Sequence, residues 1–280
     1  MRQGRNKTLT QNHYSSGVTI ITPSYNYARF IRECALSVRS ESKTVTISHI
    51  IQDGLSEDDT LAQVSSLNSH SVILISEQDA GQSDALNKAL SLVGDDQLVG
   101  WLNADEYYLP GAIDYFYQAA AENPDVEVFY GDCLFVDKRG NLLRALPSHR
   151  MSKFVLRHYG CFIPSCTLFV RASALKKFGW DVSFRRTMDW DLYLAMLENH
   201  QFKYVPYTAA AFRVHEDQVT NTPEKLDELE FMRLRAKHSI NKSSFKTLLA
   251  LMLHAVLKVL DGGYIKQLRY RKIRGQKIAA

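Results

Sequence analysis

Residues 98–106 read Leu98-Val99-Gly100-Trp101-Leu102-Asn103-Ala104-Asp105-Glu106, an apolar run that ends directly in an acidic cluster. An apolar run of this length, bounded by turn-forming residues, is typical of a strand that is buried in a sheet. In open sheets of parallel strands, ligands bind outside the carboxyl ends of the strands, where loops and helix N-termini converge. The stretch therefore predicts an α/β fold with a polar site at the end of this strand.

Three more apolar runs, rich in β-branched residues, precede this strand. They lie at residues 18–21, 45–51 and 72–75. Segments with the apolar spacing of a helix lie between the runs, at residues 28–39, 56–67 and 81–92. Strands that alternate with helices at this spacing predict a mostly parallel mixed sheet that is flanked by helices on both faces.

Polar residues follow each of these three runs. They are Thr22-Pro23-Ser24-Tyr25-Asn26, Gln52-Asp53-Gly54 and Ser76-Glu77-Gln78-Asp79-Ala80-Gly81. Carboxylates at strand ends can bind the base or ribose of a nucleotide, or hold a divalent cation against its phosphates. Asp53 suits the first task, because Gly54 permits a tight turn against a ligand, and Asp105 suits the second. The alternatives are that Asp53 and Ser56 cap the next helix, and that Asp105 lies in an ordinary acidic turn.

The chain has 280 residues, of which 45% are hydrophobic, so it can bury a substantial core. It contains no internal repeat, and its connections are short. The sequence predicts a polar leader (residues 1–16), one continuous domain (17–222) and a helical basic C-terminal extension (223–280). The four cysteines are widely spaced and predict free thiols in a reducing compartment. Because the leader lacks the apolar centre of a secretory signal, we expect a cytoplasmic protein.

The C-terminal extension concentrates positive charge. Residues 235–280 carry 11 Lys and Arg residues and one acid, whereas the rest of the chain has more acids than bases. Residues 245–260 have the spacing of an amphipathic helix, and a membrane-spanning helix needs about 20 apolar residues. We therefore expect residues 243–280 to contact an anionic membrane surface, on the inner face of the cytoplasmic membrane. The alternatives are packing on the domain or on a dimer partner; no nucleic acid partner is expected, because no nucleic-acid motif accompanies the charge.

The order of these strand ends resembles that of one family, the family 2 glycosyltransferases of the GT-A fold. Four stretches between about residue 18 and residue 220 carry the resemblance. They are VTIITPSYNYARFI, QDGLSEDDT, SEQDAGQSDALNKAL and WLNADEYYLPGAI. The resemblance implies an inverting glycosyltransferase of the bacterial cell-surface polysaccharide type. Its donor would be a nucleoside diphosphate sugar, and its acceptor would be a hydroxyl of a glycan or a lipid-linked saccharide.

The resemblance also implies which residues bind the donor and the metal. The nucleotide-sugar site would consist of Pro23, Ser24, Tyr25, Asp53, Gly81, Asp84, Asn87, Lys88, Asn103 and Ala104. Asp105 and His215 would hold a divalent cation, Mn²⁺ or Mg²⁺. Asn103 stands where the first acid of the family's metal motif is expected, so Asp105 would carry the metal contact. Glu106 stands where a second Asp often follows.

A base that deprotonates the acceptor hydroxyl is expected later in the chain. The stretch Met188-Asp189-Trp190-Asp191-Leu192 resembles the family's acidic pair before a helix, with Asp189 in the position of the base. The alternative is that Asp189 and Asp191 only stabilise the N-terminus of that helix.

Two further stretches complete the predicted site. FRVHEDQVT resembles the late loop that places His215 at the metal; without the resemblance, His215 would be an ordinary surface or core histidine. Arg213 in this stretch either contacts the diphosphate or pairs with an acid. The segment 160–169 resembles the part of the family that lines the sugar pocket, where Tyr159, Pro164 and Ser165 are expected to contact the sugar.

Two other classes of protein compete with this interpretation. A nucleotidyltransferase would share the strand-end acids and the metal, but it usually has a Gly-rich, basic loop where this chain has Thr22-Pro23-Ser24-Tyr25-Asn26. A catalytically inactive, nucleotide-sugar-binding relative predicts loss of the functional side chains, which are all present here: Asp53, Asp105, Asp189 and His215.

Overall fold

Nine strands form one mixed sheet in the order β3-β2-β1-β4-β8-β6-β9-β5, with β7 paired to β6. The computed structural model describes residues 17–39, 45–216, 218 and 224–280; the predicted leader and domain boundary lie outside this part. The strands are β1 (Val18–Ser24), β2 (Ile47–Asp53), β3 (Val72–Ser76), β4 (Leu98–Trp101), β5 (Tyr107–Tyr108), β6 (Val128–Asp137), β7 (Leu142–Leu146), β8 (Phe169–Arg171) and β9 (Phe202–Val214). The helices are α1 (Ile31–Val38), α2 (Thr60–Ser65), α3 (Gln82–Ser91), α4 (Ala112–Glu122), α5 (Lys153–His158), α6 (Ala172–Leu175), α7 (Met188–Met196), α8 (Glu224–Lys237), α9 (Ser244–Leu260) and α10 (Gly263–Arg271).

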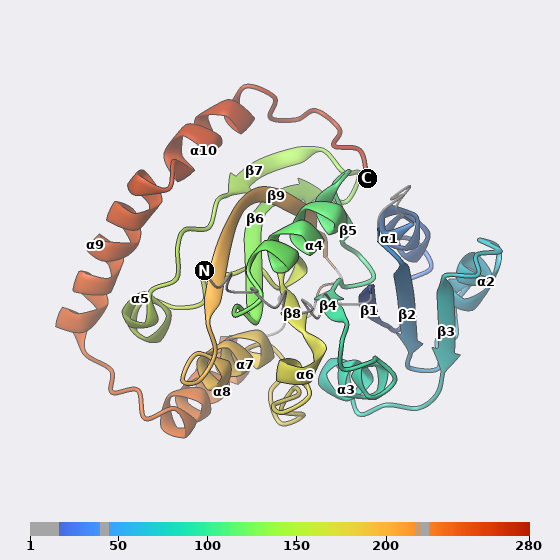
Figure 1. Cartoon of the computed structure of the whole chain (residues 1–280), viewed down its shortest axis with the longest axis horizontal. Helices are drawn as coiled ribbons and strands as arrows, with labels where there is room; N and C mark the ends of the chain where they lie inside the picture. The colour runs from blue at the N-terminus through green and yellow to red at the C-terminus, as the bar shows by residue number, and fades with distance from the viewer. Residues whose placement is uncertain (1–16, 40–44, 217, 219–223) are drawn as a thin grey trace, which may run out of the picture.

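The strands β3, β2, β1 and β4 run parallel, and each coincides with one of the apolar runs. Ser24 lies opposite Asp53, and Asp53 lies opposite Ser76, so β1, β2 and β3 end at the same level. The intervening helices α1, α2 and α3 lie within the segments that the sequence predicts. The predicted α/β fold, a mixed sheet flanked by helices, is confirmed (Figure 1).

The remaining strands pair mainly in the antiparallel sense. β8 runs antiparallel to both β4 and β6, while β9 runs parallel to β6 and antiparallel to β5. The sequence did not predict β5, β7 or β9. β9 is difficult to see in the sequence because it contains Pro206 and three consecutive alanines, residues that are depleted in strands.

Two apolar cores lie on the two faces of the sheet (Figure 1). The helices α3, α6 and α7 cover one face, where Leu86, Leu175 and Leu192 belong to one cluster. The helices α1 and α4 cover the other face and contribute Cys34 and Phe116. Because both faces are covered, β1 and β4 are buried at every residue, which explains why they read as continuous apolar runs.

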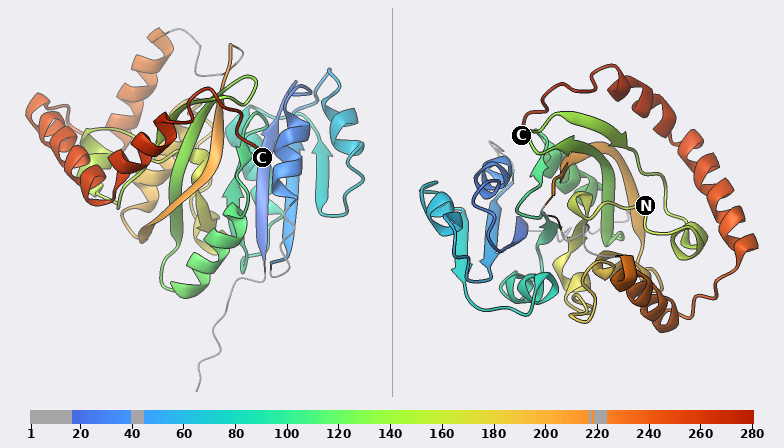
Figure 2. Two further views of the ribbon diagram at one scale, coloured as in Figure 1. Left: turned by 90° about the horizontal axis from the view of Figure 1, so that it is seen from above. Right: turned by 180° about the vertical axis from the view of Figure 1, so that it is seen from behind.

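The helices α9 and α10 lie along one rim of the molecule (Figures 1 and 2). The inner side of α9 packs against α5 and buries Ala250 and Lys258. Asp261, which follows α9, forms an ion pair with Arg150, with 2.6 Å between Oδ1 of Asp261 and Nη2 of Arg150. On α10, the ammonium group of Lys266 donates to the buried carboxylate of Asp132. The C-terminal extension therefore packs on the domain through one face. Packing on the domain is one of the alternatives that the sequence analysis gives for this extension.

The outer side of α9 is apolar and exposed. Its large apolar residues that are exposed are Phe245, Leu248, Leu249, Leu251, Met252, Val256, Val259 and Leu260. Within the described ranges, no single helix is long and apolar enough to cross a membrane, and α9 and α10 reach the required length only as a pair bent by 71°. The chain thus carries an apolar helix face that the rest of the domain leaves uncovered.

Candidate active site

A cavity of about 470 Å³ opens at the carboxyl ends of β1 and β4. Its described lining includes nine residues that the sequence predicts for the site: Pro23, Ser24, Tyr25, Gly81, Asn103, Ala104, Asp105, Ser165 and Asp189. It also includes residues that the sequence did not predict: Tyr27, Asp79, Gln82, Ala85, Trp101, Arg185, Arg186, Met188, Phe212 and Gln218. The predicted residues Asp53, Asp84, Asn87, Lys88 and His215 are not part of this described lining. The structure thus brings Asp105, the predicted metal ligand, and Asp189, the predicted base, to one cavity.

Asp105 and His215 lie together on one side of the cavity. The Nε2 atom of His215 is 2.9 Å from Oδ2 of Asp105, and both side chains are buried. The amide of Gln218 reaches the same carboxylate oxygen at 3.4 Å. The imidazole is held by the ring of Phe30, with 4.8 Å between ring centroids. His215 is thus a buried histidine whose Nε2 atom faces Asp105, the acid that the sequence singles out.

Arg213 stabilises the backbone at Asp105 and pairs with an acid. It is 2% exposed, its Nε donates to the carbonyl of Asp105 at 3.0 Å, and its Nη2 pairs with Glu33. The guanidinium also lies over the ring of Phe30, 4.9 Å from its centroid. Arg213 is absent from the described lining of the cavity. Of the two alternatives for Arg213, pairing with an acid is the one that the structure shows.

Asn103 and Glu106 shape the turn around Asp105. The Oδ1 atom of Asn103 accepts hydrogen bonds from Trp101 at 2.9 Å and from Gln82 at 2.6 Å. The carboxylate of Glu106 accepts the backbone N–H of Asn103. Burial, with the charge of Asp105 adding to it, raises the pKa of Glu106 to about 8. Glu106 therefore acts in the turn and is not part of the described lining of the cavity.

Asp53 is surrounded by hydrogen-bond donors of the chain. Its carboxylate accepts the backbone N–H of Ser56, the hydroxyl of Ser56 and the hydroxyl of Ser76. The alternative that Asp53 and Ser56 cap a helix is wrong, because α2 begins only at Thr60 and Asp58 binds the N–H of Thr60. The space beside Gly54 is filled by Asp79, whose Oδ2 would lie 2.6 Å from a Cβ at Gly54. Gly54 therefore accommodates a neighbouring acid of the cavity rather than a ligand.

The segment 81–88, which includes the first part of α3, contributes Gly81, Gln82 and Ala85 to the cavity. Gly81 has φ +112°, a conformation that favours glycine, and its N–H binds Asp79. Lys88 donates to the carbonyl of Gln78 and pairs with Asp84 at 3.3 Å. Asn87 makes two hydrogen bonds to the backbone of residue 180, at 2.7 and 2.8 Å. Through these contacts Asp84, Asn87 and Lys88 stabilise the structure beside the cavity.

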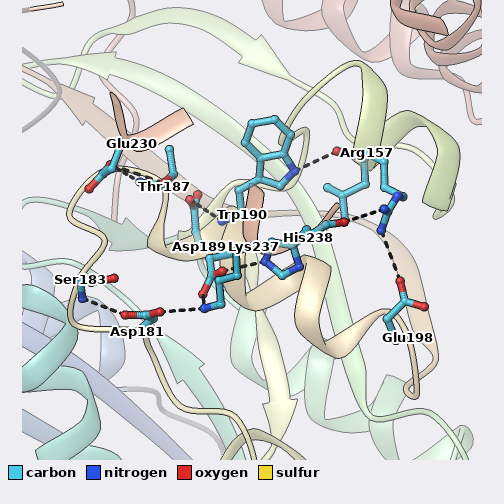
Figure 3. A network of polar contacts seen from close by, with 12 residues as sticks. Arg157, Asp181, Ser183, Thr187, Asp189, Trp190, Glu198, Glu230, Lys237 and His238 are labelled. Atoms are coloured by element: carbon cyan, nitrogen blue, oxygen red, sulfur yellow. Dashed lines mark hydrogen bonds and ion pairs between the residues drawn. The ribbon is translucent and has the colours of Figure 1, made fainter. Parts of the chain in front are cut away.

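The predicted acidic pair at the N-terminus of α7 is split between two environments (Figure 3). Asp189 lines the cavity, and its Oδ1 accepts the backbone N–H of Trp190 at 2.7 Å. Burial raises the pKa of Asp189 to about 6. Asp191 points to α8 instead, where it accepts from Lys237 at 2.8 Å and His238 at 2.7 Å. Asp191 is therefore a structural residue, and Asp189 is the acid that faces the cavity.

The predicted sugar-binding segment is only partly at the cavity. Ser165 lines it, whereas Tyr159 stacks on His254 of α9, with ring centroids 4.3 Å apart. Cys161 places its Sγ 3.9 Å from the carboxylate of Asp189, and Cys166 is fully buried. All four cysteines of the chain are free, as the sequence predicts.

The sequence reasoning missed Arg185 and Arg186, which line the cavity three and four residues before Asp189. The only signal was two adjacent arginines in a segment that otherwise resembles the family. Gln218 was also missed, although it stands in the stretch that carries His215. Residues such as these form no periodic pattern in the sequence. Only the tertiary fold shows that their side chains reach the cavity.

Comparison with known proteins assigns the chain to a family. The model of "Glycosyl transferase family 2" matches residues 19–179, more than half of the chain. The chain is a family 2 glycosyltransferase. A relative from Rickettsia typhi, described as an uncharacterized glycosyltransferase, is 30% identical over 234 residues, which cover 79% of this chain and 72% of the relative. A chondroitin synthase of Escherichia coli is 27% identical over 197 residues, and this match covers 67% of this chain and 27% of the synthase.

Solved structures share the fold of this glycosyltransferase. S. aureus TarS in complex with UDP-GlcNAc is 17% identical, with a TM-score of 0.62 over 81% of this chain and 67% of that chain. Glucosyl-3-phosphoglycerate synthase from Mycobacterium tuberculosis, in complex with Mn²⁺, UDP and phosphoglyceric acid, is 15% identical. Its TM-score is 0.57 over 81% of this chain and 82% of that chain. The fold is thus the GT-A fold that the resemblance implies, and family membership decides against a nucleotidyltransferase.

Proposed function

We propose that this glycosyltransferase moves a sugar from a nucleoside diphosphate sugar to an acceptor hydroxyl with inversion, using Asp189 as the base and a divalent cation beside Asp105. One observation carries the proposal: Asp105, with His215 against it, and Asp189 belong to the walls of one cavity although 84 positions separate the two acids in the sequence. Direct displacement needs one base for the acceptor and stabilisation of the departing diphosphate. The cavity offers groups suited to both tasks.

The nucleotide end of the donor is assigned to residues 23–25, with Gly81, Asn103 and Ala104 beside them. These residues line the cavity at the strand ends, where nucleotides bind in open α/β sheets. Asp84 and Lys88 bind the backbone of residues 80 and 78, just before Gly81, while Asp53 and Asn87 make their hydrogen bonds outside the described lining of the cavity. The solved relatives support the assignment, because TarS was solved with UDP-GlcNAc and the mycobacterial synthase with UDP.

Asp105 and His215 are the residues of this chain that would hold Mn²⁺ or Mg²⁺. Within the described part of the chain, no group of three or more His, Cys, Asp or Glu side chains is arranged as a metal centre. These cations need only one or two carboxylates when substrate phosphates and water complete their coordination, so a buried acid with one histidine fits them. When bound, the cation would neutralise charge on the departing diphosphate. The mycobacterial synthase was solved with Mn²⁺, which supports this assignment.

Asp189 is assigned as the base because it combines position with a suitable pKa. It faces the cavity from the side of α7, and burial raises its pKa to about 6. A carboxylate with this pKa is ionised at pH 7 and still basic enough to take a proton as the hydroxyl attacks. Its neighbour Asp191 is committed to Lys237 and His238, so it does not compete for this task.

The experiment is a panel of UDP-, GDP- and dTDP-sugars, each with and without Mn²⁺. We expect one nucleotide class to raise the melting temperature and to release its nucleoside diphosphate only when metal is present. Asp189→Asn should keep the thermal shift and lose the release, while Asp96→Asn, which changes an exposed acid in the turn between α3 and β4, should behave as wild type. Release that continues in EDTA, or a panel without any thermal shift, would contradict the proposal.

We also propose that the acceptor is a glycan or a lipid-linked saccharide that the enzyme meets at an anionic membrane surface. The apolar outer face of α9 is exposed, and the cationic residues Arg269, Arg271, Lys272 and Arg274 lie exposed beyond it. An amphipathic helix with adjacent cations is the usual means of binding at such a surface. Residues 17–222 would then form the catalytic domain, and residues 223–280 would form the docking extension.

Vesicle sedimentation tests the membrane assignment. Wild type should sediment with vesicles that contain phosphatidylglycerol and stay in solution with neutral vesicles. The triple variant Leu249→Ser, Met252→Ser, Val256→Ser should lose this binding and keep its melting temperature, because these side chains are exposed. Val182→Ser, which changes an apolar residue exposed elsewhere, is the matched control. Sedimentation of the triple variant equal to that of wild type would refute the assignment.

A further inference from the structure

The junction between α9 and α10 has the geometry of an anion site. The two helices meet at a bend of 71°, with Asp261 and Gly262 between them (Figure 1). Gly262 has φ +71°, a conformation that favours glycine. Its chain neighbours aside, no atom of the described residues lies within 4 Å of the position that a Cβ would take there. The bend therefore leaves open space directly before the first residue of α10.

The N-terminus of α10 has backbone donors that are not used within the helix. The first hydrogen bond of the helix runs from the N–H of Lys266 to the carbonyl of Gly262, at 3.1 Å. The N–H groups of residues 263–265 come before this bond, and no side chain caps the helix. Such N–H groups, together with the helix dipole, attract an anion.

A buried ammonium group lies beside this first turn. Lys258 of α9 is 8% exposed, and its Cγ would lie 2.6 Å from a Cβ at Gly263. Its Nζ lies 5.8 Å from the ring centroid of Tyr264, the second residue of α10. Burial, with the charge of Arg144 adding to it, lowers the pKa of Lys258. A cation thus lies at the positive end of a helix, where a bound anion would stabilise both.

The acids near the junction are bound to other cations. Asp261 accepts the backbone N–H of Arg150 at 2.7 Å and pairs with its guanidinium group. The buried carboxylate of Asp132 is bound by Lys266. Among the residues that the structure describes, Lys258 has neither an ion pair nor a hydrogen bond from its ammonium group. Its charge is therefore left for a ligand to compensate.

Exposed apolar side chains flank the same junction. Leu260 is exposed in the last turn of α9, and Ile265 and Leu268 are exposed on α10. Inorganic phosphate at the N-terminus of α10 would leave this apolar surface uncovered, whereas the acyl chains of a phospholipid would contact it. The junction thus combines an anion site with the apolar surroundings that suit a lipid.

We propose that Lys258 and the N–H groups of residues 263–265 bind the phosphate group of an anionic membrane lipid. This inference rests on the proposed membrane contact and adds the lipid group that the C-terminal extension recognises. The apolar face of α9 provides the general attraction to the membrane, and the junction adds a specific polar contact. Inorganic phosphate shares the chemistry of the headgroup, and the experiment separates these two sources.

The experiment is an NMR titration of the backbone N–H groups of residues 263–265 in the full, ¹⁵N-labelled chain. The probes are dihexanoylphosphatidylglycerol, kept below its critical micelle concentration, and inorganic phosphate, with sodium chloride at equal ionic strength as the reference. We compare wild type with Lys258→Met, which removes the ammonium group and nearly keeps the length of the side chain. The matched control is Lys246→Met, which removes the same charge from an exposed position of α9.

For wild type we expect the lipid to shift the signals of residues 263–265 with a Kd about tenfold or more below that of inorganic phosphate, because the acyl chains add apolar contacts. Lys258→Met should weaken lipid binding by about tenfold or more, because a charge-assisted hydrogen bond is lost. Lys246→Met should change the Kd by less than about twofold. Lys258→Met should not lower the melting temperature, because it replaces a buried charge by an apolar side chain. The loss of binding is then not a loss of folding.

Two results would overturn the inference. One is a titration without shifts at residues 263–265, or with equal shifts in wild type and Lys258→Met. The other is an equal Kd for the lipid and for inorganic phosphate, which would make the junction a site for free phosphate. The proposed membrane contact is decided separately by vesicle sedimentation. Because the NMR probe is a monomeric lipid, a wild type that does not sediment with vesicles refutes the membrane contact whatever the titration shows.

Discussion

The cavity has two walls that are built in different ways. The strand-end wall consists of residues 23–25 and 103–105, and the strap wall consists of residues 185–189. Hydrogen-bonded parallel strands position the first wall, so its side chains follow from the register of the sheet. The second wall is the N-terminus of a helix, which Glu230 and Lys237 of α8 hold from outside (Figure 3). The strand-end wall is therefore assigned to the donor, and the strap wall to the acceptor and its base.

The largest expected effect is a loss of kcat when Asp189, which belongs to the strap wall, is changed. Asp189→Asn should reduce kcat by about 10²- to 10⁴-fold, the usual contribution of a general base, and leave donor affinity unchanged. Asp191→Asn, two residues away, should lower kcat by less than tenfold, because Asp191 lies against Lys237 and His238 outside the cavity. Steady-state kinetics with the donor that the panel selects measures both. Equal losses in the two variants would remove Asp189 as the base.

The pH dependence of the rate tests whether Asp189 is the base. Since the pKa of Asp189 is raised to about 6 and the base has to be ionised, kcat/KM should fall about tenfold per pH unit below pH 6. It should be level from about pH 7 upward until another group titrates. A profile measured between pH 4.5 and 8.5 would show this. A rate that stays level down to pH 5 would contradict the assignment.

Stability should change in opposite directions at the two acids of α7. The pKa of Asp189 is raised in the folded state from 3.8 to about 6, so its ionisation destabilises the fold above pH 6. Asp189→Asn should therefore raise the free energy of unfolding at pH 7.5 by up to about 3 kcal/mol, and the gain should vanish toward pH 4. Asp191→Asn should instead lower it by about 2 kcal/mol, because Lys237 and His238 lose a shared carboxylate acceptor. Urea denaturation at both pH values measures these changes; a loss of stability in both variants would contradict the raised pKa.

The smallest expected effect concerns Asn87, which the sequence predicts at the donor but which bonds the backbone of residue 180. Asn87→Ala removes two hydrogen bonds to the backbone of residue 180 and should cost about 2 kcal/mol, or about 6 °C in melting temperature. Nucleotide affinity should change by less than about threefold, because Asn87 is not in the described lining of the cavity. A tenfold loss of affinity with an unchanged melting temperature would show direct contact with the donor.

The same two walls show how far the sequence predicts this protein. The strands β1 to β4 and the cavity residues at their ends were predictable, because buried parallel strands leave continuous apolar runs and their ends meet at one edge. The strap wall was not predictable, since its place depends on Glu230, which lies more than 40 positions later in the sequence. In the sequence both Asp53 and Asp105 follow a strand, with Asp53 expected at the nucleotide and Asp105 at the metal. Only the hydrogen bonds of the fold separate Asp53, which accepts from Ser56 and Ser76, from Asp105, which faces the cavity.

One set of binding measurements, on variants of both walls, tests most directly whether the donor and the metal bind at the strand-end wall. Calorimetry of nucleoside diphosphate binding, with and without Mn²⁺, is carried out on wild type, Asp105→Asn and Asp189→Asn. We predict that Mn²⁺ strengthens binding at least tenfold in wild type and in Asp189→Asn, and that Asp105→Asn loses this gain. A gain that survives in Asp105→Asn, or that disappears in Asp189→Asn, would contradict the assignment of metal and donor to the strand-end wall.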